Sequence, residues 1–300
     1  MKIAVTGAFS YTGKFITKRL LARGEEVITL TNHPNRPDPF GGKVKAFPLD
    51  FDEAGMTKSL QGVDVLVNTY WVRFDKDDNT QPRAVENTRK LVNAAKKAGV
   101  KRIVHISIAN NSADSHLPYY WGKAANEKAV IDSGLSYAIL RPTVLVGHED
   151  ILINNIACLL RRFPFFLIPG DGSYGIQPIY VDDLADLAVE GVYGTENYFT
   201  DAVGPDSYTF NELVRLVGET IGAKRPLISV PPRLALLAAQ FISLFVKDVI
   251  LTPEEVDGLM ANLLVSKEPP RGKLSFKDWL VSNRDTIGMK YASELKKHYL

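Results

Sequence analysis

The chain has 300 residues, of which 45% are hydrophobic and 23% are charged, and its formal net charge is +2 at pH 7. This composition is typical of a globular protein, and the length suits one large α/β domain with a smaller appendage. So small a net charge favours neither nucleic acid nor an anionic membrane as a partner. A single cysteine, Cys158, cannot form an internal disulfide. A reducing compartment fits best, and we expect a cytoplasmic protein.

Short apolar runs alternate with amphipathic stretches in the first half, as in βαβ units around a parallel sheet. The pattern predicts strands at Lys2–Thr6, Glu26–Thr31, Val44–Pro48, Val63–Asn68, Arg102–Ser107 and Tyr137–Arg141. It predicts helices at Thr12–Arg23, Gln81–Ala98 and Pro118–Ser133, each followed by a glycine that can end it.

After Pro142, predicted helices alternate with Pro- and Gly-rich loops. In the loop Phe163–Pro178 the hydrophobic residues follow no clear period. The helices are expected at Ile151–Arg162, Asp182–Tyr193, Phe210–Ile221, Arg233–Val246 and Pro253–Leu264. We predict a Rossmann-type, doubly wound parallel α/β sheet in residues 1–147. A smaller, mostly helical substrate lobe is expected in residues 148–300, with residues 179–203 returning to the sheet.

The most hydrophobic stretch of the second half is Leu234–Val246. It is shorter than the ~20 apolar residues that cross a bilayer, so we expect no membrane span. A buried or substrate-covering helix is the favoured interpretation, and contact with a membrane surface is the alternative.

A glycine-bearing turn joins the first strand to the first helix. Backbone N–H groups of such a turn, together with the positive end of the helix dipole, bind the pyrophosphate of a dinucleotide. Gly7 permits the tight turn, and Gly13 lets the helix pack closely on the strand. We expect cofactor contacts from Gly7, Phe9, Ser10, Tyr11, Thr12 and Gly13. The alternative is a turn that binds nothing.

No carboxylate follows the second strand, which continues Asn32-His33-Pro34-Asn35-Arg36. An acidic residue there would bind the ribose hydroxyls and favour NAD(H), whereas polar groups and an arginine accommodate a 2′-phosphate. We therefore predict a preference for NADP(H), with NAD(H) as the alternative, and contacts from Asn32, His33 and Arg36. A solvated loop that contacts neither cofactor remains open.

Three residues near the fifth strand form a candidate catalytic set. Tyr119 and Lys123 are four residues apart on a predicted helix and therefore share one face. An ammonium group beside a phenol stabilises the phenolate and suits the tyrosine for proton transfer. Ser107, at the end of the preceding strand, can hold a substrate oxygen. The alternative is a packed tyrosine with a solvated lysine. Glu127 continues the same face and is interpreted as an ion-pair partner.

The stretch Thr6–Gly13 resembles the T-G-x-x-G-x-x-G turn of short-chain dehydrogenases and reductases of the extended and atypical branches, with Ser10 in place of the middle glycine. Ser107, Tyr119 and Lys123 resemble that superfamily's serine–tyrosine–lysine set. The resemblance implies that Lys123 also binds the nicotinamide ribose. It further implies cofactor contacts from Asp50, Phe51, Asn68, Thr69, Pro142, Thr143 and Val144.

The resemblance covers most of the chain and is closest to the atypical group around the NADPH-binding accessory subunit of respiratory complex I and epimerase-like proteins. Asp182, in an epimerase-type segment, is expected to cap a helix.

These features predict an oxidoreductase that acts on the carbonyl/alcohol pair of a small molecule. One alternative is a non-catalytic sensor, assembly factor or complex subunit that binds NADP(H), and another is a nucleotide-sugar epimerase or dehydratase. No metal site is expected. The expected partner is a small-molecule substrate, and the open alternatives for assembly are a homo-oligomer or a larger complex.

Overall fold

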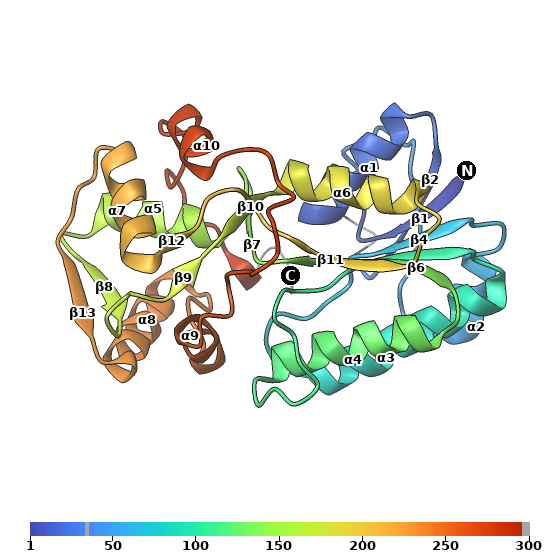
Figure 1. Cartoon of the computed structure of the whole chain (residues 1–300), viewed down its shortest axis with the longest axis horizontal. Coiled ribbons are helices and arrows are strands. Elements are labelled where there is room, and N and C mark those ends of the chain that lie inside the picture. Colours follow the sequence, from blue (N-terminus) through green and yellow to red (C-terminus); the bar gives the residue numbers. More distant parts are fainter. Residues whose placement is uncertain (34–35, 296–300) are drawn as a thin grey trace. The chain divides into compact units, whose positions relative to one another are not determined.

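The computed structural model of the chain describes residues 1–33 and 36–295, so Pro34 and Asn35 of the predicted cofactor loop lie outside the described residues. The chain divides into two units (Figure 1). The first unit comprises Met1–Pro142 and Val181–Ala202, and the second comprises Thr143–Tyr180 and Val203–Leu300. Each unit has its own core.

A parallel sheet of seven strands forms the centre of the first unit, in the order β11-β6-β5-β4-β1-β2-β3. The predicted Rossmann-type sheet is confirmed. Its strands are β1 (Lys2–Thr6), β2 (Glu26–Thr31), β3 (Lys45–Pro48), β4 (Val65–Asn68), β5 (Arg102–Ile106), β6 (Ser136–Pro142) and β11 (Tyr198–Ala202).

Helices cover both faces of this sheet. Figure 1 shows α1 (Tyr11–Ala22) and α6 (Val181–Tyr193) on one face and α2 (Glu53–Ser59), α3 (Gln81–Ala98) and α4 (Pro118–Asp132) on the other. Because both faces are covered, every residue of the central strands β4 and β5 is buried. The chain order of the strands reverses next to β1, which lies between β4 and β2. Ligands of such sheets bind at the carboxyl ends of the strands at this point.

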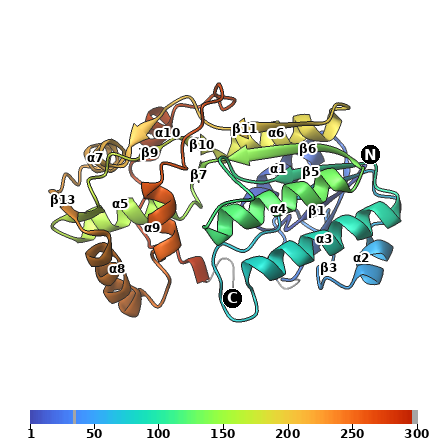
Figure 2. The same cartoon turned by 60° about the horizontal axis from the view of Figure 1, so that its bottom comes forward.

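The second unit contains three pairs of short strands and five helices among its described residues. The strand pairs are β7 (Val144–Val146) with β10 (Pro178–Tyr180), β8 (Phe166–Pro169) with β13 (Leu227–Val230), and β9 (Gly175–Ile176) with β12 (Tyr208–Thr209). The helices, visible in Figure 2, are α5 (Leu152–Arg162), α7 (Phe210–Thr220), α8 (Pro232–Val246), α9 (Pro253–Met260) and α10 (Phe276–Ser282).

The core of the second unit is rich in aromatic side chains. The rings of Tyr174 and Phe210 stack with 5.4 Å between their centroids, and those of Phe276 and Trp279 stack at 6.2 Å. Such pairs bury a large apolar area in few residues, which lets short helices and two-stranded ribbons form one core.

Three local predictions are wrong. The region Phe163–Pro178 was expected to lack regular structure, but it contains β8 and β9. Asp182 does not cap a helix; it lies inside the first turn of α6, where its carboxylate pairs with Arg19 at 2.7 Å. The helix at Leu234–Val246 is not buried, because four of its large apolar side chains are exposed.

No helix among the described residues is both long enough and apolar enough to cross a membrane.

Candidate functional site

The turn between β1 and α1 brings two glycines into contact. Gly7 has a φ of +64°, a conformation that glycine adopts without strain. A β-carbon on Gly13 would lie only 2.2 Å from the carbonyl oxygen of Gly7, so no side chain fits there. The helix therefore begins directly against the end of the strand. The first N–H groups of a helix lack acceptors within the helix and favour an anion, so this start of α1 has the arrangement that the sequence predicted for a phosphate site.

Ser10 occupies the N-cap of α1 in an extended conformation, but its side chain does not cap the helix. Its hydroxyl instead accepts a hydrogen bond from the guanidinium group of Arg36, with 2.8 Å between Nη1 and Oγ. Burial lowers the pKa of Arg36 from its usual value. The arginine after β2 and the serine of the turn thus lie side by side.

The loop after β2 uses its acidic side chain for its own fold. The carboxylate of Asp38 accepts hydrogen bonds from the backbone N–H groups of Phe40 and Gly42 at 2.8 and 2.6 Å. Phe40 in turn packs against Phe9 of the glycine turn, with 6.3 Å between ring centroids. Arg36 is therefore the charged side chain that this loop places beside the glycine turn. Asn32 is exposed and His33 is half-buried.

Asn68, at the end of β4, is fully buried and connects three strands. Its amide oxygen lies 3.2 Å from the hydroxyl of Thr6, and its amide nitrogen lies 3.1 Å from Nδ1 of His105. Burial lowers the pKa of His105 to about 3, so this imidazole is neutral. Asn68 braces the sheet from inside, whereas the hydroxyl of Thr69 bonds to the carbonyl of Thr6 beside Gly7.

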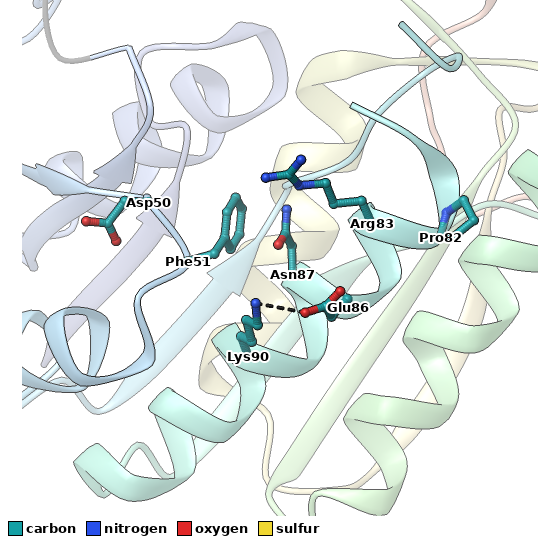
Figure 3. A pocket seen from close by; sticks show the side chains of 7 residues that line it. All are labelled: Asp50, Phe51, Pro82, Arg83, Glu86, Asn87 and Lys90. Carbon is teal, nitrogen blue, oxygen red and sulfur yellow. Dashed lines mark ion pairs between the residues drawn. The ribbon is translucent and has the colours of Figure 1, made fainter. Parts of the chain in front are cut away.

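A pocket of about 460 Å³ lies at Asp50 and Phe51, two of the predicted cofactor residues. Phe51 adopts a φ of +59°, and its ring lies 4.8 Å from that of Tyr70. The hydroxyl of Tyr70 accepts a hydrogen bond from Asn87 at 3.1 Å. Figure 3 shows side chains of α3 facing the loop after β3 across this pocket, which is lined by Asp50, Phe51, Pro82, Arg83, Glu86, Asn87 and Lys90. The α3 residues that line this pocket were not predicted from the sequence, because exposed polar positions on a helix carry no distinguishing pattern.

Lys123 is buried on α4, and Tyr119, one turn earlier on the same helix, is half-buried. Its ammonium donates a hydrogen bond to the carbonyl of Ile106 at 3.1 Å and lies 5.8 Å from the centre of the Tyr119 ring. Burial lowers the pKa of Lys123 to about 7, against an opposing effect of Glu127. With this pKa the lysine can exchange a proton near neutral pH, and the residue whose carbonyl it contacts, Ile106, directly precedes Ser107 in the chain. The neighbouring Tyr120 is buried, which raises its pKa and makes it a poor proton donor.

A polar network that the sequence did not predict surrounds Ser107. The amide of Asn111 donates to the hydroxyl of Ser107 at 3.3 Å and also to the carboxylate of Glu127. Glu127 is almost fully buried and forms a two-point ion pair with Arg141. The interpretation of Glu127 as an ion-pair partner is confirmed. The pair holds Asn111, and Asn111 in turn orients Ser107.

Trp71 covers the lysine and the tyrosine. Its ring lies 4.9 Å from the ammonium of Lys123 and meets the Tyr119 ring edge-on at 5.7 Å. A β-carbon on Gly122 would lie 2.6 Å from the indole, so only glycine allows this packing. The contact of Trp71 with Lys123 is a tertiary feature that no local sequence pattern marks.

The remaining predicted cofactor residues divide between the two units. Pro142 ends β6 in the first unit, where its carbonyl accepts from Ala109 at 2.9 Å. Thr143 and Val144 belong to the second unit. There the hydroxyl of Thr143 bonds to the carbonyl of Gln177, and Val144 pairs with Pro178.

Comparison with known proteins identifies the glycine turn. Residues 7–154 match the model of a family described as NAD(P)H-binding. The match covers nearly half of the chain. The resemblance to short-chain dehydrogenases and epimerase-like proteins is thereby confirmed at the level of fold and dinucleotide binding.

Curated relatives include subunits and assembly factors. NADH dehydrogenase [ubiquinone] 1 alpha subcomplex subunit 9 of Arabidopsis thaliana is 25% identical over 72% of this chain and 57% of its own length. This chain thus spans little more than half of that subunit. Photosystem II assembly factor Ycf39 of Cyanidium caldarium is 25% identical over 82% of this chain and 79% of its own length.

Among solved structures, the NADPH-dependent quinone oxidoreductase QOR2 of Escherichia coli has a similar fold. Its TM-score is 0.76 at 21% identity, over 94% of this chain and 98% of that chain.

Proposed function

We propose that this protein is an NADP(H)-dependent oxidoreductase that interconverts the carbonyl and alcohol forms of a small molecule. The observation that carries the proposal is the burial of Lys123 beside Tyr119 on one face of α4, with a pKa lowered to about 7. A lysine is costly to bury, and such a perturbed group in a dinucleotide-binding fold is typical of proton transfer.

Each residue has a defined role in this proposal. The glycine turn and the start of α1 fit a pyrophosphate, because Gly13 leaves no side chain between the helix and Gly7. The bound nicotinamide supplies or accepts the hydride. Ser107, oriented by Asn111, holds the substrate oxygen, and the hydroxyl of Tyr119 transfers the proton to or from it. Lys123 stabilises the phenolate and replenishes its proton.

The proposed preference for NADP(H) rests on Arg36. Its guanidinium lies beside Ser10 of the turn, while the carboxylate of Asp38 is bonded to its own loop. A 2′-phosphate is well matched by a guanidinium. The use of NADPH by the structurally similar quinone oxidoreductase is consistent with this choice.

A second candidate function is supported by Trp71, whose ring covers the ammonium of Lys123. In this case the protein binds NADP(H) without turnover, as a subunit or assembly factor of a larger complex. The names of the curated relatives favour it as well.

Replacing Tyr119 by Phe tests both functions. NADPH consumption is measured with a panel of quinones, aldehydes and ketones, and NADPH binding is measured by calorimetry. We expect Tyr119→Phe to lower kcat by about 100-fold or more while the Kd for NADPH is unchanged. Tyr137→Phe, on β6, is the matched control and should retain activity. Unchanged turnover in Tyr119→Phe with intact binding contradicts the catalytic role. Binding without turnover of any substrate by the wild type favours the second candidate.

A further inference from the structure

Helix α8 of the second unit exposes a stripe of large apolar side chains. Leu234, Leu237, Phe241 and Leu244 are 52, 59, 63 and 76% exposed. They are spaced three, four and three residues apart, which places them on one face of the helix. The opposite face packs on the protein, where Ala235 and Ala239 are buried. Figure 2 shows α8 at the edge of the second unit.

Basic side chains lie at both ends of this stripe. The segment 224–247 contains Lys224, Arg225, Arg233 and Lys247 but no aspartate or glutamate. Arg233 lies in the first turn of α8 and Lys247 is its C-cap, and both are exposed. The exposed stripe therefore has a cation at each end.

This combination fits one kind of partner. Apolar side chains flanked by basic groups suit the surface of a bilayer with anionic headgroups. The apolar side chains enter the boundary of the acyl chains, and the basic groups contact the phosphates. A second copy is disfavoured, because a two-fold contact through α8 would bring two basic segments together. The helix has 15 residues, too few to span a bilayer but enough to lie in its surface.

We propose that α8 docks the protein on anionic lipid membranes, with Leu234, Leu237, Phe241 and Leu244 inserted at the lipid boundary. This role is independent of the dinucleotide site. Phe241 lies near the middle of the stripe and contributes the largest apolar side chain. Arg233 and Lys247 hold the two ends of the helix at the headgroups.

The test is sedimentation of the full chain with vesicles of phosphatidylcholine alone or mixed with phosphatidylserine. The wild type is expected to sediment with the anionic vesicles and to be released as salt is raised. Phe241→Asp should lower the partition coefficient about tenfold or more. Val281→Asp is the matched control, because Val281 is 48% exposed on α10 of the same unit. It should bind as the wild type does.

Thermal unfolding and the Kd for NADPH show whether each variant is folded. If Phe241→Asp fails to fold, Leu244→Ser replaces it, since Leu244 is the most exposed residue of the stripe. The proposal is overturned if the wild type stays in the supernatant with both kinds of vesicle, the neutral and the anionic. It is likewise overturned if Phe241→Asp and Val281→Asp lose vesicle binding equally. It is also overturned if light scattering shows a dimer that Phe241→Asp converts to a monomer, because the stripe then contacts a second copy.

Discussion

The guanidinium group of Arg36 donates a hydrogen bond to the hydroxyl of Ser10, which stands where related turns have a glycine. The two residues are 26 positions apart and meet at the start of α1. A hydroxyl that accepts from an arginine still has its own proton to donate. The pair therefore presents a guanidinium and a hydroxyl donor together, which suits a phosphate group.

Arg36→Ala is expected to weaken NADPH binding by about 10- to 100-fold, because a charge-assisted hydrogen bond to a phosphate is lost. The Kd for NADH should change by less than about threefold, since NADH has no 2′-phosphate. Calorimetry with both cofactors measures the difference. Lys43→Ala removes an exposed charge from the same region and serves as the control. An equal loss of affinity for both cofactors would mean that Arg36 does not contact the 2′-phosphate.

Gly13→Ala should destabilise the protein by about 2 kcal/mol or more and abolish tight cofactor binding. The added β-carbon would lie 2.2 Å from the carbonyl oxygen of Gly7, and a backbone atom cannot move aside as a side chain does. Urea unfolding and NADPH titration measure the two effects. Lys18→Ala, at an exposed position of the same helix, should be close to neutral. If Gly13→Ala is as stable as the wild type, the turn accommodates a wider separation between Gly7 and the start of α1.

Trp71→Leu tests whether the indole competes with the cofactor for Lys123. If Lys123 binds the nicotinamide ribose, the ring that now lies 4.9 Å from its ammonium must first move away. Removing that cation–π contact should strengthen NADPH binding by about 3- to 10-fold. Trp121→Leu, on α4, is the control for the loss of an indole. Weaker binding by Trp71→Leu would instead indicate that the ring packs against the bound cofactor.

The first half of the fold was predictable because its signals are local. β1, β2 and α3 have the bounds that the periodicity predicted, since an apolar run or stripe ended by glycine leaves little choice of boundaries. The strands β8, β9, β12 and β13 were missed. They are only two to four residues long and form ribbons whose partners are distant in sequence, so no local period marks them.

The candidate site was predictable where it depends on spacing and not where it depends on tertiary contacts. Tyr119 and Lys123 are four positions apart, which places both on one helix face. The link from Asn111 to Ser107 depends instead on the ion pair of Glu127 with Arg141, which joins α4 to β6. Side chains from separate elements converge there only after the sheet has formed.

Lys123 should also make the stability of the protein depend on pH. Burial lowers its pKa from 10.5 to about 7, so between these values the unfolded chain holds a proton that the native protein lacks. Raising the pH through this window removes the proton from the unfolded chain and favours the native state. Below pH 7 both states hold the proton, and this contribution is constant.

The free energy of unfolding of the wild type, minus that of Lys123→Met, should therefore rise from about pH 7 to pH 10 and be flat below. Subtracting the variant cancels the other groups that titrate in this range. Lys128→Met is the matched control, because Lys128 lies on α4 but is 76% exposed. Its difference from the wild type should show no comparable rise. If the Lys123→Met difference is also flat across the window, the lysine keeps its proton in the native protein. It would then act on Tyr119 only as a fixed positive charge.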